Sequence, residues 1–153
     1  WYAYPEVEYR DAHLVLIHHP KGKPWETSKK IIKRSMYSEG NPVLFQEPGG
    51  RIWLLFVVLK GSYWTDAELN GTYSDDGGYS WSPARRLWKE LGMMVRHPPV
   101  LLKDNSFALP AYDEIRKEVV ILKSSPPYDN WNILHHFSGL ELRFFRARSP
   151  WGL

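Results

Sequence analysis

Short apolar runs separated by turn residues make up much of this sequence. The clearest are HLVLI (His13–Ile17), IWLLFVVL (Ile52–Leu59) and EVVIL (Glu118–Leu122), and Gly, Pro, Asn or Asp residues flank them. Runs of this length that are rich in Val, Ile and Leu are typical of buried strands, whereas helices require longer periodic patterns. The pattern therefore predicts an all-β fold.

Two turn segments predict hairpins between such strands. EPGG (Glu47–Gly50) and KDNS (Lys103–Ser106) each follow one apolar run and precede the next. Their residues tolerate the backbone angles of tight turns. Ser82–Gly92 is the only helix candidate, because it begins with a capping Ser followed by Pro and ends with Gly. A strand followed by a loop fits that segment equally well.

The sequence also contains an internal repeat. Pro42-Val43-Leu44 is echoed by Pro99-Val100-Leu101, at a spacing of 99 − 42 = 57 residues. Three segments leave an apolar run, make a turn and end at Trp25, Trp81 and Trp131, with spacings of 81 − 25 = 56 and 131 − 81 = 50 residues. Units of this size with several antiparallel strands suit the blades of a β-propeller. A β-sandwich is the alternative.

Composition supports a packed domain with room for aromatic surfaces. The 153 residues are 43% hydrophobic and 24% charged, which is the balance of a folded protein. Aromatic residues reach 15%, and such rings either fill wide sheet interfaces or line sites for flat apolar faces such as those of sugars. The net charge of +3 comes from scattered side chains, so we expect no nucleic-acid partner.

The sequence excludes some kinds of site and leaves the cellular compartment open. The absence of Cys excludes disulfides and thiolate metal sites, and it leaves the cellular compartment unknown. No apolar run approaches the roughly 18 residues of a membrane span, and no signal-peptide pattern opens the chain. The chain does not begin with Met, and we expect a processed protein or a fragment.

The segment SDDGGYSW (Ser74–Trp81) combines acids, glycines and a tryptophan. A catalytic carboxylate pair is one interpretation, but the neighbouring side chains of Asp75 and Asp76 point apart on an extended backbone. In a turn, an Asp side chain accepts hydrogen bonds from nearby backbone N–H groups, and Gly77 and Gly78 accept positive φ. The turn interpretation is therefore favoured.

This segment resembles the Asp box, or BNR repeat, of the sialidase superfamily, whose fold is a six-bladed β-propeller. Four other segments resemble the sialidase-like BNR proteins in the same order, and together the likeness covers roughly residues 12–131. These segments are Glu39–Leu44, Gly50–Leu54, Arg96–Leu102 and Leu109–Glu114. The resemblance implies a β-propeller of the six-bladed sialidase type, of which about three blades are present.

The resemblance also implies where a functional site lies. In the superfamily the Asp boxes occupy outer turns of the blades, and the substrate binds at the mouth of the central channel. Sialidases use an arginine cluster on the sugar carboxylate, a Tyr nucleophile activated by a Glu, and an Asp as acid and base. Planar guanidinium groups suit this role because they bind carboxylates bidentately.

Candidate residues follow from the matching segments. Arg96 is the candidate for binding a carboxylate. Tyr112 and Glu114 are the candidate nucleophile and its base, because residues two apart on a strand share a face. Asp113 faces the other way and either contacts substrate or caps the end of the strand.

The earlier repeat offers further candidates. Glu39, a candidate catalytic carboxylate, and Asn41, a candidate substrate-binding residue, occupy the place that Arg96 takes one repeat later. His97 lies beside Arg96 and is a candidate ligand contact, although contact with solvent is the alternative. Trp64 is a candidate sugar platform or a cover for the neighbouring blade.

No metal or cofactor is expected. His18-His19 and His135-His136 are adjacent pairs in predicted strands, so the two rings of each pair project to opposite faces. Neither pair is suited to chelating one ion.

The expected domain is a single partial propeller. Its units run roughly over residues 1–38, 39–95 and 96–140, followed by a tail at 141–153. The superfamily's first blade, with its leading Arg and acidic Asp, has no match here. Open edges and the apolar tail residues Phe144, Phe145 and Trp151 predict self-association, half of an assembly or a fragment.

Three functions remain open at this point. The favoured one is a sialidase-like glycoside hydrolase, or a fragment of one, that acts on terminal sugars of glycoconjugates. The alternatives are a propeller that binds carbohydrate without catalysis and a propeller that serves as a platform for protein partners.

Overall fold

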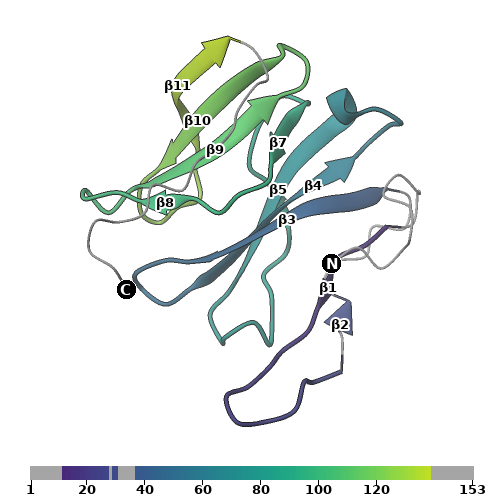
Figure 1. The fold of residues 1–153 in the computed structure, drawn as a ribbon, viewed down its shortest axis with the longest axis vertical. Coiled ribbons are helices and arrows are strands. Elements are labelled where there is room, and N and C mark those ends of the chain that lie inside the picture. Colours follow the sequence, from purple (N-terminus) through teal and green to yellow (C-terminus); the bar gives the residue numbers. More distant parts are fainter. Residues whose placement is uncertain (1–11, 28, 31–36, 139–153) are drawn as a thin grey trace.

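The computed structural model describes residues 12–27, 29–30 and 37–138, and this part of the chain is all-β (Figure 1). The strands are β1 (Val15–Leu16), β2 (Lys29–Lys30), β3 (Ser38–Gln46), β4 (Ile52–Leu59), β5 (Ala67–Ser74), β6 (Arg85–Arg86), β7 (Met93–Val95), β8 (Val100–Leu101), β9 (Phe107–Asp113), β10 (Glu118–Ser124) and β11 (Asn132–Ser138). One 3₁₀ turn, η1 (Trp64–Asp66), precedes β5. Within the described residues, no helix has the length and apolar character needed to cross a membrane.

The strands form two larger antiparallel sheets and one small one. The first sheet has the order β3-β4-β5-β6, and the second has the order β11-β10-β9-β7, with β8 also paired to β9. β1 and β2 pair as a separate two-stranded sheet. Both larger sheets are open, and they lie against each other in Figure 1. The second sheet begins at Met93, before the unit boundary expected at residue 96.

The first sheet is covered on both faces, which explains why β4 is apolar at every position. Trp53, Leu55 and Val57 belong to the core between the two larger sheets. Phe56 and Val58 belong to a second cluster on the opposite face, together with residues near β1. Burial of one such side chain stabilises the fold by roughly 1.5–3 kcal/mol, so a strand with two covered faces needs no polar alternation.

The core between the larger sheets is built from their facing strands. β3 contributes Val43 and Phe45, and β9 contributes Phe107, Leu109 and Ala111. The alternation of buried and half-buried residues along β9 follows from this arrangement, because only one face of β9 meets the first sheet.

Two of the three repeated tryptophans occupy equivalent places. Trp81 packs on the cluster that Leu14, just before β1, forms with one face of β4. Trp131 packs in the core that joins the second sheet to the first. Trp25 differs, because it is 67% exposed and stacks on His19. The repeat therefore describes the two larger sheets.

Both predicted hairpins are present. In the β3–β4 turn, the Gly50 N–H donates to the Glu47 carbonyl at 2.9 Å, and Gly50 has φ 94°. In the β8–β9 turn, Asn105 has φ 60°, and the Asp104 carboxylate accepts a hydrogen bond from the Ser106 N–H at 3.0 Å. Each turn places Gly or Asn where a positive φ is required.

The helix alternative for Ser82–Gly92 is wrong, and the alternative of a strand and loop is confirmed. The backbone of this segment bonds to β5 instead of to itself. Arg85 and Arg86 pair with β5 as strand β6, and the Leu87 N–H donates to the Leu69 carbonyl at 2.9 Å. Tertiary pairing therefore overrides the local capping pattern.

Candidate functional site

The Asp-box segment forms a closed turn at the end of β5. The Asp76 carboxylate accepts hydrogen bonds from the Ser80 N–H at 2.9 Å and the Ser74 hydroxyl at 2.7 Å. The hydrogen bonds from Ser80, followed by that from Ser74, hold the pKa of Asp76 well below its ordinary value. The Trp81 indole N–H donates to the Gly78 carbonyl at 3.0 Å. The groups that a catalytic carboxylate would use are therefore occupied within the turn.

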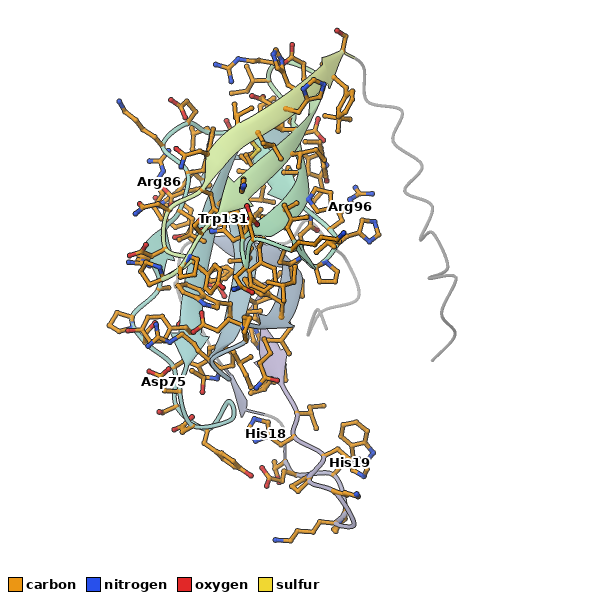
Figure 2. The ribbon with its side chains drawn as sticks, turned by 90° about the vertical axis from the view of Figure 1, so that its left-hand side faces the viewer. His18, His19, Asp75, Arg86, Arg96 and Trp131 are labelled. Atoms are coloured by element: carbon orange, nitrogen blue, oxygen red, sulfur yellow. The ribbon has the colours of Figure 1, made fainter. Side chains whose placement is uncertain are left out.

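The neighbouring acid of this turn faces outward. Asp75 pairs with Arg51 of the β3–β4 hairpin, with Oδ1 2.7 Å from the guanidinium Nε. Figure 2 shows Asp75 at the lower left and Arg96 at the upper right, well apart from each other. The interpretation of SDDGGYSW as a structural turn is confirmed.

The candidate site residues lie toward the other end of the sheets, where two strands are interrupted. In β3, Gly40 pairs with Val57 and Val43 pairs with Leu55, so the residues between them bulge. In the second sheet the pairing breaks off after Val95 of β7 and resumes at Val100 of β8. Asn41 and Arg96 lie in these two interruptions. Bulges commonly redirect side chains next to functional sites.

Arg96 and Tyr112 form the best-defined contact of the site. The guanidinium Nε of Arg96 donates to the phenol oxygen of Tyr112 at 2.9 Å, and the guanidinium carbon lies 5.4 Å from the ring centroid. Tyr112 is half-buried, whereas Arg96 is exposed. Because the bond uses Nε, the terminal nitrogens of the guanidinium fork are not engaged by Tyr112.

The environment of Tyr112 favours the neutral phenol. Burial raises the pKa of Tyr112 above its ordinary value, and the charge and hydrogen bond of Arg96 act in the opposite direction. The negative charge of Glu114 raises the pKa of Tyr112 further. Arg96 and Glu114 therefore both act on the Tyr112 phenol.

The two acids after Tyr112 are engaged in the β9–β10 turn. The Asp113 carboxylate accepts hydrogen bonds from the N–H groups of Ile115 at 2.8 Å and Arg116 at 2.9 Å, and it pairs with the Arg116 guanidinium at 2.7 Å. The Glu114 carboxylate lies 2.8 Å from the ammonium group of Lys117. These contacts place Asp113 at the end of the strand and not beside Arg96.

The remaining candidates lie in different environments. Glu39 is buried at the start of β3, where its N–H donates to the Ala12 carbonyl at 3.0 Å. Trp64 is half-buried in η1 and packs against the core between the larger sheets, which fits the covering role better than a sugar platform. His97 is exposed beside Arg96.

The two rings of the His18-His19 pair contact different partners. His18 lies 3.4 Å from the Glu26 carboxylate and meets the Tyr79 ring edge-on, whereas His19 stacks on Trp25. Figure 2 shows His18 and His19 projecting in different directions. A search of the described residues finds no group of His, Asp or Glu side chains arranged to hold a metal ion.

A cavity of about 280 Å³ lies beside the Asp box, away from these candidates. It is lined by Leu44, Ile52, His18, Tyr79 and Trp81, among others. None of the candidate site residues lines it. The candidate site is therefore defined by the hydrogen bond of Arg96 and by the nearby strand interruptions, and the cavity is separate from it.

Sequence reasoning missed the direct pairing of Arg96 with Tyr112. It paired Tyr112 with Glu114 because residues two apart share a face of a strand. Lys117 was also missed as the partner of Glu114, although opposite charges three residues apart in a tight turn are a detectable signal.

Comparison with known proteins places the chain in a family. A crystal structure of a protein of unknown function from Dyadobacter fermentans DSM 18053 is similar in fold, with a TM-score of 0.69 and 17% sequence identity. The similarity covers 84% of this chain but 44% of the other, so the chain spans less than half the length of that protein. No curated protein matches. The BNR repeat-like domain matches residues 9–136, and the chain belongs to this BNR repeat-like family.

Proposed function

We propose that this chain is part of a sialidase-like glycosidase that binds the carboxylate group of a terminal sugar. Membership of the BNR repeat-like family supports the class of protein. The contact between Arg96 and Tyr112 carries the proposal, because it orients an exposed guanidinium beside a half-buried phenol.

The physical basis is the geometry of the guanidinium group. Its Nε is bonded to Tyr112, so this bond does not occupy the fork formed by the two terminal nitrogens. A planar carboxylate matches such a fork through two parallel hydrogen bonds. The contact with Tyr112 also limits the freedom of a long side chain, which lowers the entropic cost of binding.

Tyr112 and a carboxylate from Glu39 or Glu114 are the proposed catalytic groups. A phenol with a raised pKa is neutral at pH 7, so its attack on a sugar requires a base that removes the proton. Glu114 is close enough to influence the pKa of Tyr112 through its charge. The acid and the additional arginines expected of a sialidase would come from outside this chain, because the chain spans less than half the length of its structural neighbour.

Binding of a matched pair of ligands tests the first step. We expect sialic acid to bind more tightly than its methyl ester, which has the same ring without the negative charge. Arg96→Gln should remove the difference, with a loss of roughly 10- to 100-fold for the acid, whereas Arg96→Lys should retain part of it. Equal affinity of the wild-type chain for acid and ester contradicts the proposal.

Hydrolysis tests the second step. An aryl sialoside should release its leaving group with the full-length protein, and the rate should fall in Tyr112→Phe. Absence of turnover on a panel of aryl glycosides would remove the hydrolase from consideration. Sugar binding that persists in Tyr112→Phe and Glu114→Gln without turnover would instead support a carbohydrate-binding propeller. The raised pKa of Tyr112 favours this second candidate.

We also propose that the two larger sheets are blades of a six-bladed propeller and that open edges lead to self-association. β11 supports this, because Ile133, Leu134 and Phe137 are each about half exposed. The apolar tail at Phe144, Phe145 and Trp151 lies outside the described residues. Size-exclusion chromatography that shows a monomer without exposed apolar surface would count against association.

A further inference from the structure

We propose that the cavity beside the Asp box binds a small neutral phenol, a single ring with one hydroxyl group, and that His18 accepts the hydrogen bond of this hydroxyl. The cavity has a volume of about 280 Å³. Pockets for drug-sized ligands measure roughly 300–1,000 Å³, so a single ring is the appropriate size here. The proposal does not rest on the function proposed above, because Arg96 and Tyr112 are not among the residues that line this cavity.

Three segments of the chain form the walls of the cavity. Leu16 comes from β1, and Leu44 and Ile52 come from β3 and β4. Trp81 adds an aromatic wall at the end of the Asp-box turn. Among the described residues that line the cavity, none is Lys, Arg, Asp or Glu. Such walls suit an apolar ring, whereas the many hydroxyl groups of a sugar would find few partners on them.

His18 supplies an unpaired hydrogen-bonding atom at the margin of the cavity. Its Nε2 is buried and has no hydrogen-bond partner within the described part of the chain. A Cβ on Gly78 would lie 3.1 Å from this Nε2 and 3.7 Å from Leu16, and all three residues line the cavity. An unsatisfied buried polar atom is unfavourable, so a ligand that pairs with Nε2 removes that cost.

Glu26 determines which kind of group His18 can bind. Its carboxylate lies 3.4 Å from Nδ1 of His18, and its backbone N–H donates to the His18 carbonyl at 2.8 Å. A carboxylate accepts hydrogen bonds, so it favours the neutral imidazole with the proton on Nδ1. Nε2 then carries a lone pair, and its partner must be a donor such as a phenolic O–H.

Tyr79 controls access to this nitrogen. Its ring meets the His18 ring edge-on, with centroids 4.6 Å apart, and Tyr79 also lines the cavity. Because Tyr79 is already 54% exposed, turning its side chain toward solvent uncovers little further apolar area. This movement exposes the His18 ring, and a phenol from solution then takes the place that the Tyr79 ring occupied.

A matched pair of ligands and a matched pair of variants test the proposal. Phenol and toluene have nearly the same size, but only phenol carries a donor. In His18→Phe, which keeps a ring, the affinity for phenol should fall roughly 3- to 10-fold, and that for toluene should change less than about twofold. His19→Phe is the control and should leave both affinities unchanged, because His19 also lines the cavity but is exposed and stacks on Trp25.

Nitrogen magnetic resonance of the wild-type chain gives a readout that does not depend on the folding of a variant. The Nε2 signal of His18, assigned through the contact of its ring with Tyr79, should have the position of an unprotonated nitrogen. Phenol should shift this signal in a saturable way, and toluene should not shift it in the same direction. Arg96→Gln should leave the affinity for phenol unchanged, and an excess of sialic acid should not displace phenol.

Several outcomes overturn the proposal. They are the absence of saturable phenol binding, an Nε2 signal that does not move at saturating phenol, and an equal loss of phenol and toluene affinity in His18→Phe. A loss in His19→Phe as large as that in His18→Phe would assign the hydrogen bond to the wrong histidine. Binding of methyl glucoside in place of phenol would make the cavity a sugar site.

Displacement of phenol by sialic acid would place phenol beside Arg96 and would also contradict the proposal. None of these measurements uses turnover of a glycoside. Failure of the proposed glycosidase function and failure of the phenol site are therefore distinguishable.

Discussion

The indole of Trp131 meets the ring of Phe45 edge-on, with centroids 6.4 Å apart and planes at 87°. Trp131 precedes the last strand of the second sheet, and Phe45 lies on β3 of the first. This contact joins the two sheets near one edge of their shared core. Its contribution can be measured because the chain offers a second tryptophan in a contrasting environment.

Trp131→Ala should destabilise the chain strongly, whereas Trp25→Ala should not. Trp131 is 5% exposed, and loss of a buried aromatic side chain typically costs about 3–5 kcal/mol. Trp25 is 67% exposed, and its removal should change the free energy of unfolding by less than about 1 kcal/mol. Urea denaturation of both variants measures the difference. Equal losses would mean that the core between the sheets does not stabilise the chain.

The strands and turns could be predicted because their signals are local. IWLLFVVL is apolar throughout because both faces of β4 are covered, and the Asp box closes on its own side chains. For Ser82–Gly92 the sequence left a helix and a strand with a loop as equal alternatives, and pairing with β5 decides for the strand and loop. Local capping residues carry no information about such a partner.

The site could be predicted only in part. The resemblance to sialidases selected Arg96, Tyr112 and Asn41, and the structure brings Arg96 and Tyr112 into contact. Their pairing depends on interruptions in the strand ladders, and a one-residue change of register would redirect the side chains. Alternation along the strand therefore suggested Glu114 as the partner of Tyr112, whereas the closest charged partner of Glu114 is Lys117.

Gly78→Ala should destabilise the Asp-box turn more than Gly77→Ala. Both glycines have positive φ, so alanine at either site carries a backbone cost of roughly 1–2 kcal/mol. A Cβ on Gly78 would also lie 3.1 Å from the His18 ring nitrogen Nε2, whereas one on Gly77 would meet nothing within 4 Å. Thermal or urea denaturation should report this additional loss.

The extra cost at Gly78 should depend on His18. In a His18→Ala background, Gly78→Ala should cost about as much as Gly77→Ala, because the crowding atom is gone. The double-mutant cycle isolates this interaction from the backbone strain. An undiminished cost of Gly78→Ala without His18 would place the conflict elsewhere in the turn.

Asp76 should make the stability of the chain sensitive to acid. Its pKa in the folded state is below the ordinary value of 3.8, so below about pH 4 the unfolded state binds more protons than the folded state. The stabilisation is present above this range and is lost as the pH falls toward the folded pKa. In Asp76→Asn the free energy of unfolding, measured with urea, should depend less on pH. The comparison runs between about pH 5 and 2, a rough window around the ordinary pKa of an Asp. Asp75→Asn is the control for a change of charge in the same turn, and an identical flattening there would argue against a specific role of Asp76.

Tyr112 should have the opposite effect at alkaline pH. Its folded-state pKa is above the ordinary value of 10.0, because burial disfavours the phenolate. Above about pH 10 the unfolded state therefore loses this proton before the folded state does, and the free energy of unfolding should decrease as the pH rises. Tyr112→Phe removes the ionisable group, so the decline between pH 9 and 11, a rough window around that value, should be shallower than in the wild type. Tyr63→Phe, at a position that is 73% exposed, controls for the loss of one phenol. An equally steep decline in Tyr112→Phe would mean that the Tyr112 phenol ionises as readily in the folded chain as in the unfolded chain.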